Sequence, residues 1–193
     1  MDPWEDRWQV GDTPWDHGKA APPLLEYLER ESLEGRVLVP GCGSGHEVRA
    51  LAKHGAEVVG MDIAPTAIKV ASSHSPSNGE VYELENFLSL PARHHGKFDC
   101  LVEHTCFCAI DPAEREDYVK AAHQALKPHG KFFGIFFIDV PDPEHEGPPF
   151  MSSLRELSNF FDPYFHTVEA WRPNRVFEER KDCLEQVRLM VRR

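Results

Sequence analysis

Residues 36–62 read RVLVPGCGSGHEVRALAKHGAEVVGMD, and this stretch decides the fold. The short apolar run at 37–39 ends at a Pro-Gly pair and predicts a buried strand. Residues 48–54 predict a helix that Gly55 ends, and residues 57–62 predict a second strand. A strand, a helix and another strand in this order predict two parallel strands joined by a crossover helix.

The same alternation continues through the rest of the chain. Further strands are predicted at residues 81–84, 98–103, 132–138, 165–171 and 183–191. Further helices are predicted at residues 65–71, 111–126 and 152–160, and residues 128–130 are expected to end the second of them. The pattern therefore predicts an α/β fold in which helices cover both faces of a parallel sheet.

Residues 1–35 precede this alternation and are predicted to form an N-terminal arm. Trp4 and Trp8 lie four residues apart, which places them on one face of a helical turn. The length of the chain fits one domain over residues 1–193, which comprises the arm over residues 1–35 and a core over residues 36–193.

The composition excludes several classes of protein. Hydrophobic residues make up 41% of the chain and charged residues 27%, as in soluble globular proteins. The 21 basic and 32 acidic residues give a net charge of -11, which argues against nucleic acid and anionic membrane surfaces as partners. No apolar run has the length of a membrane-spanning helix, and residues 1–6 do not look like a secretory signal. The five cysteines lack disulfide-framework or zinc-site spacing, so we expect reduced thiols, no metal and a cytoplasmic protein.

A glycine loop and an acidic residue point to a cofactor. Gly41, Gly43 and Gly45 follow the first strand, and their missing side chains let the backbone approach a ligand closely. Asp62 ends the second strand, where a carboxylate commonly accepts hydrogen bonds from ribose hydroxyls. Together they predict an adenosine-containing cofactor. The alternative is a tight strand–helix turn with a helix-capping aspartate.

Six motifs occur in order along nearly the whole chain. They are W-x-x-x-W at 4–8, T-P-W-D-x-G at 13–18, V-P-G-C-G at 39–43, F-C-A-I at 107–110, L-K-P at 126–128 and G-P-P-F at 147–150. With these motifs the chain resembles the class I S-adenosylmethionine-dependent methyltransferases. More narrowly, it resembles the thiopurine S-methyltransferase superfamily in its plant-type halide/thiol methyltransferase branch. Val39 stands where many methyltransferases carry an acid, a departure that the narrower family shares.

The resemblance implies a Rossmann-like, seven-stranded, mostly parallel sheet with helices on both faces and the N-terminal helical arm as a lid. The cofactor is S-adenosylmethionine, the product is S-adenosylhomocysteine, and no metal is implied. The implied cofactor-binding residues are Trp4, Trp8, Trp15, Gly41, Gly43, Asp62, Asn86, Phe87 and His104. The indole rings suit a sulfonium because an aromatic face attracts a cation. Alternatively, the tryptophans only fix the arm to the core, and Phe87 is a core residue.

The acceptor site is implied to comprise Trp15, Cys106, Phe107 and Phe150. Cys106 stands where relatives often carry an aromatic residue, and its smaller side chain would widen the pocket. The segment that ends at Phe150 is either a wall of this pocket or a surface turn. No general base is assigned with confidence. His104 and His17 are the candidates, and a structural role for His104 is an equal alternative.

Methyl transfer from a sulfonium is an in-line displacement whose leaving group departs neutral, so alignment and exclusion of water matter most. A thiolate, hydrosulfide or halide needs no strong base. We therefore predict methylation of a small thiol, hydrosulfide or halide by a monomer. The alternatives are a methyltransferase for an oxygen, nitrogen or metalloid acceptor, and a non-catalytic binder of the cofactor. A nicotinamide-dependent oxidoreductase is disfavoured by the G-x-G-x-G spacing at 41–45.

Overall fold

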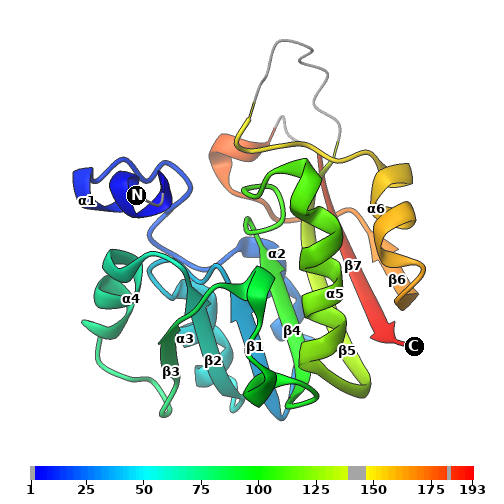
Figure 1. Ribbon diagram of the computed structural model, residues 1–193, viewed down its shortest axis with the longest axis horizontal. Helices are drawn as coiled ribbons and strands as arrows, with labels where there is room; N and C mark the ends of the chain where they lie inside the picture. The colour runs from blue at the N-terminus through cyan, green and yellow to red at the C-terminus, as the bar shows by residue number, and fades with distance from the viewer. Residues whose placement is uncertain (1–2, 139–146, 182–183) are drawn as a thin grey trace.

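The computed structural model describes residues 3–138, 147–181 and 184–193. Seven strands form one sheet in the order β3-β2-β1-β4-β5-β7-β6 (Figure 1). The strands are β1 Arg36–Pro40, β2 Glu57–Asp62, β3 Val81–Leu84, β4 Phe98–His104, β5 Leu126–Ile138, β6 Phe165–Trp171 and β7 Leu184–Arg192. Strand β7 runs antiparallel to β5 and β6, and the other neighbours are parallel. The predicted Rossmann-like, seven-stranded, mostly parallel sheet is confirmed.

Helices cover both faces of the sheet, as predicted. The α-helices are α1 Pro3–Val10, α2 Pro22–Leu28, α3 His46–Lys53, α4 Pro65–Ser72, α5 Arg115–Ala125 and α6 Leu154–Phe161. Short 3-10 turns are η1 Phe87–Ser89, η2 Ala92–His94, η3 Pro112–Glu114 and η4 Glu178–Arg180. No helix of the described residues is long and apolar enough to cross a membrane.

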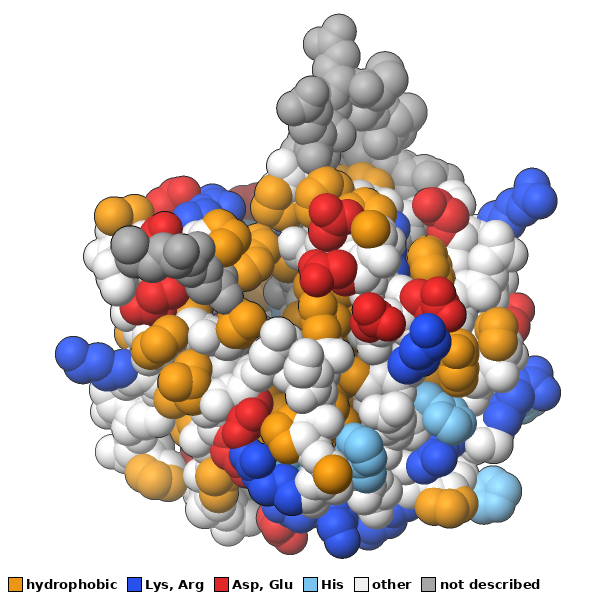
Figure 2. All heavy atoms as spheres, viewed as in Figure 1, with side chains coloured by type: hydrophobic (Ala, Val, Ile, Leu, Met, Phe, Trp, Pro, Cys, Tyr) orange, Lys and Arg blue, Asp and Glu red, His pale blue; other side chains and the backbone are white. Residues whose placement is uncertain are grey.

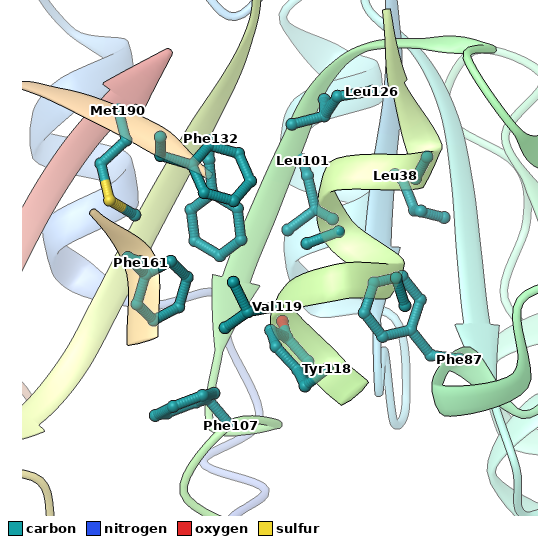
Figure 3. Close-up of a cluster of buried hydrophobic side chains, with 14 of the residues drawn as sticks. Leu38, Phe87, Leu101, Phe107, Tyr118, Val119, Leu126, Phe132, Phe161 and Met190 are labelled. Atoms are coloured by element: carbon teal, nitrogen blue, oxygen red, sulfur yellow. The ribbon is translucent and has the colours of Figure 1, made fainter. Parts of the chain in front are cut away.

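Two buried clusters form the core, one on each face of the sheet. Leu38 and Leu101 pack with α5 and α6 residues such as Val119 and Phe161 (Figure 3). Residues on the opposite side of the same strands, such as Val37, pack with α2 and α3. Because successive strand residues point to opposite faces, a nearly continuous apolar strand such as β1 is buried on both.

Strand β5 begins earlier than the sequence pattern predicts. Residues 128–130 were expected to end a helix, but α5 ends at Ala125 and β5 begins at the next residue. In the pairing with β4, Leu126 lies opposite Phe98 and Lys131 lies opposite Cys100, so the intervening residues form an irregularity in the strand. Pro128 lies in this irregularity. A proline lacks an N–H donor and is tolerated in a strand where the hydrogen-bond ladder is interrupted.

The carboxyl ends of β1, β2 and β4 lie at one edge of the sheet. Strand order reverses between β1 and β4, and ligands of open α/β sheets bind at such a switch point. Gly41, Asp62 and His104 all stand at this edge, at the ends of these three strands.

Candidate active site

The glycine loop after β1 is held in a conformation that favours glycine. Gly41 and Gly43 have φ values of 56° and 52°, in the left-handed region. A Cβ on Gly41 would lie 2.7 Å from the Cys106 Sγ, because the segment after β4 closes against the loop. A Cβ on Gly43 would lie 3.4 Å from a ring carbon of Trp8. The loop therefore presents backbone between Cys106 on one side and the N-terminal arm on the other.

Asp62 is fixed by backbone donors at the end of β2. Its Oδ2 accepts from the Gly43 N–H at 2.9 Å, and its Oδ1 accepts from the Ala64 N–H at 2.9 Å. The residue is 8% exposed. A carboxylate oxygen accepts more than one hydrogen bond, so these contacts orient the group and are compatible with ribose hydroxyls as further donors. Backbone loop and carboxylate together fit the adenosine and methionine parts of S-adenosylmethionine.

The three predicted tryptophans gather beside the glycine loop. Trp15 makes edge-to-face contacts with Trp4 and Trp8, at centroid distances of 5.3 and 6.1 Å. Trp8 is the indole that meets the loop, while the Arg7 guanidinium lies 4.5 Å from the centroid of the Trp15 ring. In Figure 2 the surface is hollowed beside α1, with hydrophobic side chains at the rim of the hollow. The arm thus brings an aromatic cluster to the predicted cofactor site.

His104, at the end of β4, is fixed in one tautomer by two buried partners. Its Nδ1 lies 2.9 Å from a Glu47 carboxylate oxygen, and its Nε2 lies 3.1 Å from Nη1 of Arg180. A guanidinium only donates, so Nε2 accepts and the Nδ1–H donates to Glu47. Burial raises the pKa of Glu47, but the His104 ring and the Ala21 N–H outweigh it and hold that pKa below its ordinary value. Both ring nitrogens of His104 are therefore engaged, Nδ1 with Glu47 and Nε2 with Arg180.

His17 joins the same group from the N-terminal arm. Its ring stacks on Phe177 at 4.1 Å, and the His104 ring stacks on the same phenylalanine at 6.1 Å. Burial, followed by the positive charge of Arg180, lowers the pKa of His17. Its buried Nε2 has no hydrogen-bond partner among the described residues. Of the two histidines predicted as possible bases, His17 is the one with a ring nitrogen left to accept a proton.

Sequence reasoning missed Phe177 and Arg180. Arg180 is 8% exposed, pairs with Glu185 at 3.2 Å and lies 4.4 Å from the centroid of the Phe137 ring. It stands in the charged segment 177–181, whose composition is typical of a solvated turn, so no local signal marked it. The structure places this cation beside His104 at the carboxyl edge of the sheet.

A conservative substitution tests how much the contacts of Arg180 with His104 and Glu185 stabilise the fold. We expect Arg180→Lys to lower the free energy of unfolding by about 1–2 kcal/mol, because Nη1 of Arg180 donates to both His104 and Glu185 and the shorter lysine side chain does not reach its position. Urea unfolding at pH 7 measures this change. Lys53→Arg, at the exposed end of α3, is the matched control and should leave the stability unchanged. Equal stability of Arg180→Lys and the unmodified protein would show that the bridging geometry has no energetic value.

The predicted acceptor residues divide between the site and the core. Cys106 is partly exposed beside Gly41, and burial raises the pKa of its thiol well above the ordinary value. Phe107 is 2% exposed and packs in the core with Tyr118 and Phe136. Contact of Phe107 with an acceptor remains a prediction.

The segment that carries Phe150 is tied to the loop after β4. The Phe150 N–H donates to the Cys108 carbonyl at 2.6 Å, and its carbonyl accepts from the buried Arg115 at 2.6 Å. The Gly147–Pro148 and Pro148–Pro149 peptide bonds are cis. This segment follows the acidic run at 142–146, which lies outside the described residues. Contact of Phe150 with an acceptor remains a prediction.

The predicted adenine residues after β3 also differ in placement. Asn86 is exposed, and its side chain accepts from the Leu88 N–H at 2.9 Å as the cap of η1. The Phe87 ring is buried against Tyr118 at a centroid distance of 5.0 Å. Phe87 would therefore contact adenine through its backbone rather than its ring. The adenine-binding roles of Asn86 and Phe87 remain predictions. No group of side chains suited to a metal ion occurs in the described part of the chain.

Comparisons with known proteins show the family of the chain. The profile of the family described as Thiopurine S-methyltransferase (TPMT) matches residues 1–190. "Probable thiol methyltransferase 2" of Arabidopsis thaliana is 36% identical over 166 residues, which cover 83% of this chain and 71% of that protein. "Thiocyanate methyltransferase 1" of Brassica oleracea matches with the same identity and coverage.

The solved structure of the Burkholderia thailandensis 1,6-didemethyltoxoflavin-N1-methyltransferase, with its substrate and S-adenosylhomocysteine bound, shares the fold. The TM-score is 0.72 at 19% identity, over 98% of this chain and 85% of that one. Fold, glycine loop, strand-end carboxylate and family profile lead to one conclusion: the chain belongs to the thiopurine S-methyltransferase family and is an S-adenosylmethionine-dependent methyltransferase.

Proposed function

We propose that this methyltransferase methylates a small acceptor that reacts as an anion: a thiolate, hydrosulfide or halide. The observation that carries the proposal is the buried arrangement at the end of β4, where Glu47 and Arg180 engage both nitrogens of His104, so that this histidine has no nitrogen left to act as a base. An acceptor that is already an anion needs no base, and the positive charge of the bound sulfonium would favour the thiolate form of a thiol. The names of the relatives from Arabidopsis thaliana and Brassica oleracea support the same acceptor class.

The residues present would hold the cofactor and keep the reaction dry. Bound S-adenosylmethionine supplies an electrophilic methyl group on a sulfonium. The backbone of Gly41 and Gly43 would cradle its methionine end, and Asp62 would accept from the ribose hydroxyls. The arm tryptophans would exclude water and stabilise the cationic sulfonium. Alignment of an already nucleophilic acceptor then supplies most of the rate enhancement.

A second candidate acceptor class has a specific observation in its favour. The buried Nε2 of His17 has no partner among the described residues, and its lowered pKa leaves the ring neutral at pH 7. A neutral imidazole is able to take a proton from a hydroxyl or amine acceptor. Methylation of oxygen or nitrogen in a small molecule is therefore the alternative, with His17 as the base.

A product assay distinguishes these functions. The purified protein is incubated with S-adenosylmethionine and, separately, with small thiols, hydrosulfide, iodide, thiocyanate, thiopurine, phenols and amines, and S-adenosylhomocysteine is quantified. We expect release that depends on a sulfur or halide acceptor and that His17→Ala leaves largely intact. Release only with phenols or amines, abolished by His17→Ala, would establish the alternative. Cofactor binding without release from any acceptor would indicate a non-catalytic binder.

The same proposal includes the state of the protein. We propose a monomer of one domain over residues 1–193 that works in the cytoplasm. The described cysteines are all unpaired, which suits a reducing compartment. Size-exclusion chromatography with light scattering measures the oligomeric state directly.

A further inference from the structure

Two carboxylates of the N-terminal arm reach the helices that follow β1 and β2. Glu5 of α1 accepts from the Thr66 N–H at 2.9 Å and from the Thr66 hydroxyl at 2.7 Å. Asp16 lies 2.9 Å from Nε2 of His46, the first residue of α3. Figure 1 shows α1 beside α4, at the edge of the molecule that carries the carboxyl ends of these strands. The arm is thus fastened on both sides of the predicted cofactor site.

The beginning of α4 lacks a cap of its own. Its N-cap residue is Ala64, which has no side-chain acceptor, and the next residue, Pro65, has no N–H. The Thr66 N–H is therefore an early helix donor that needs an acceptor from elsewhere. Glu5 supplies that acceptor and places a negative charge where the helix dipole favours one. The Thr66 N–H, followed by its hydroxyl, lowers the pKa of Glu5, as expected for a carboxylate bound in its charged form.

The cap links two parts of the predicted cofactor site, the Asp62 carboxylate and the tryptophans of the arm. The Ala64 N–H donates to the Asp62 carboxylate, so the ribose-binding position and the capped turn share one short segment. On the arm, α1 carries Trp4 and Trp8 on either side of Glu5, and the Trp8 ring faces Gly43. Loss of the cap would release the tryptophans from the glycine loop without removing any group from the loop.

We propose that Glu5 is a positioning residue for cofactor binding: by capping α4 from the arm, it holds the tryptophans over the glycine loop. The inference rests on the proposed function only for the identity of the cofactor. If only a fraction of the molecules has a closed arm, the apparent affinity for the cofactor is the affinity of the closed form multiplied by that fraction. The effect is expected chiefly on the cofactor, because Glu5 contacts neither the His104 nor the Arg180 group in the described contacts.

The test is a double-mutant cycle read by calorimetry with S-adenosylhomocysteine. We expect Glu5→Ala to weaken binding by roughly 3- to 30-fold, the range seen when a helix cap is removed. Thr66→Val, which keeps the N–H and removes the hydroxyl, is expected to weaken binding less and to have no further effect in the Glu5→Ala background. Glu5→Gln keeps an acceptor oxygen and should rescue part of the loss. Additive effects of Glu5→Ala and Thr66→Val would overturn the proposal.

The matched control is Glu116→Ala, which removes an exposed carboxylate that pairs with Lys120 at 2.9 Å on α5. It should bind S-adenosylhomocysteine as the unmodified protein does. In steady-state assays Glu5→Ala should raise KM for the cofactor more than KM for the acceptor, because Trp8 meets the glycine loop directly whereas Trp15 follows through its contacts with Trp4 and Trp8. A merely structural role predicts instead a lowered melting temperature with unchanged affinity of the folded fraction.

Arm position has its own readout, which needs no ligand. In a Trp171→Phe background the remaining tryptophans are Trp4, Trp8 and Trp15, so fluorescence reports on the arm alone. We expect Glu5→Ala to shift this emission to longer wavelength in the absence of ligand. An unshifted emission together with unchanged affinity would overturn the inference. A wild-type protein that fails to bind S-adenosylhomocysteine would refute the proposed cofactor instead, and the emission shift would still decide whether Glu5 holds the arm.

Discussion

Replacing Asp62 by alanine is expected to weaken S-adenosylhomocysteine binding by about 100- to 1,000-fold. Hydrogen bonds to a charged acceptor contribute roughly 1.5–3 kcal/mol each, and ribose offers two hydroxyl donors. The substitution also leaves the Gly43 and Ala64 N–H groups without their present acceptor, so the glycine loop loses its fixed orientation. Calorimetric titration measures the affinity, and circular dichroism confirms that the variant is folded.

The control for Asp62→Ala lies on the same strand. Glu57 stands at the amino end of β2, and its side chain is 71% exposed, so Glu57→Ala should bind as the unmodified protein does. Asp62→Asn retains one acceptor oxygen and should fall between the two. If Asp62→Ala binds within twofold of the unmodified protein, Asp62 only supports the strand–helix turn, which is the alternative that its position in the sequence also allows.

Local sequence patterns were sufficient for most of the fold. The predicted strands at 57–62, 81–84 and 165–171 have the bounds found in the structure, because each is an apolar or β-prone run between turn residues. The error at 128–130 has a physical cause. Helix-breaking residues such as Pro128 and Gly130 interrupt a strand ladder as readily as they end a helix. Only the pairing with β4 distinguishes an interrupted strand from a helix end.

The site was predictable only where the chain itself brings residues together. Gly41, Gly43 and Asp62 end neighbouring strands, so their convergence follows from the topology. The Arg180 group does not follow from it, because the residue stands in a short turn before the last strand and reaches His104 across 76 residues of sequence. The burial of Phe107, three residues after the end of β4, is likewise a tertiary feature that the local sequence does not mark.

The second large expected effect is on the pH dependence of stability, and it comes from Glu103 of β4. No sequence signal marked this residue. The residue is 1% exposed, its Oε1 accepts from the Phe107 N–H at 2.7 Å, and its Oε2 accepts from the Tyr118 hydroxyl. These donors favour the charged form, but burial dominates and raises the pKa of Glu103 to about 7. The native protein therefore holds a proton there that the unfolded chain releases near pH 4.5.

The expected result is a loss of stability with rising pH. Between pH 5 and 8 the native state binds more protons at Glu103 than the unfolded state does, so the free energy of unfolding falls, by up to about 3 kcal/mol. Glu103→Gln is neutral in both states and should lack this contribution. Urea unfolding of both proteins at pH 5, 6, 7 and 8 measures the difference between their slopes.

The comparison isolates Glu103 from other groups that titrate in this range. His17 and His123 have pKa values lowered chiefly by burial, so each makes the protein more stable as pH rises through this window. Their contribution has the opposite sign and is common to both proteins. Parallel slopes would mean that Glu103 is ionised throughout. Since Glu103 directly precedes His104, a steeper fall in the unmodified protein would show that this carboxyl is neutral below about pH 7, at the strand end where an anionic acceptor is proposed to bind.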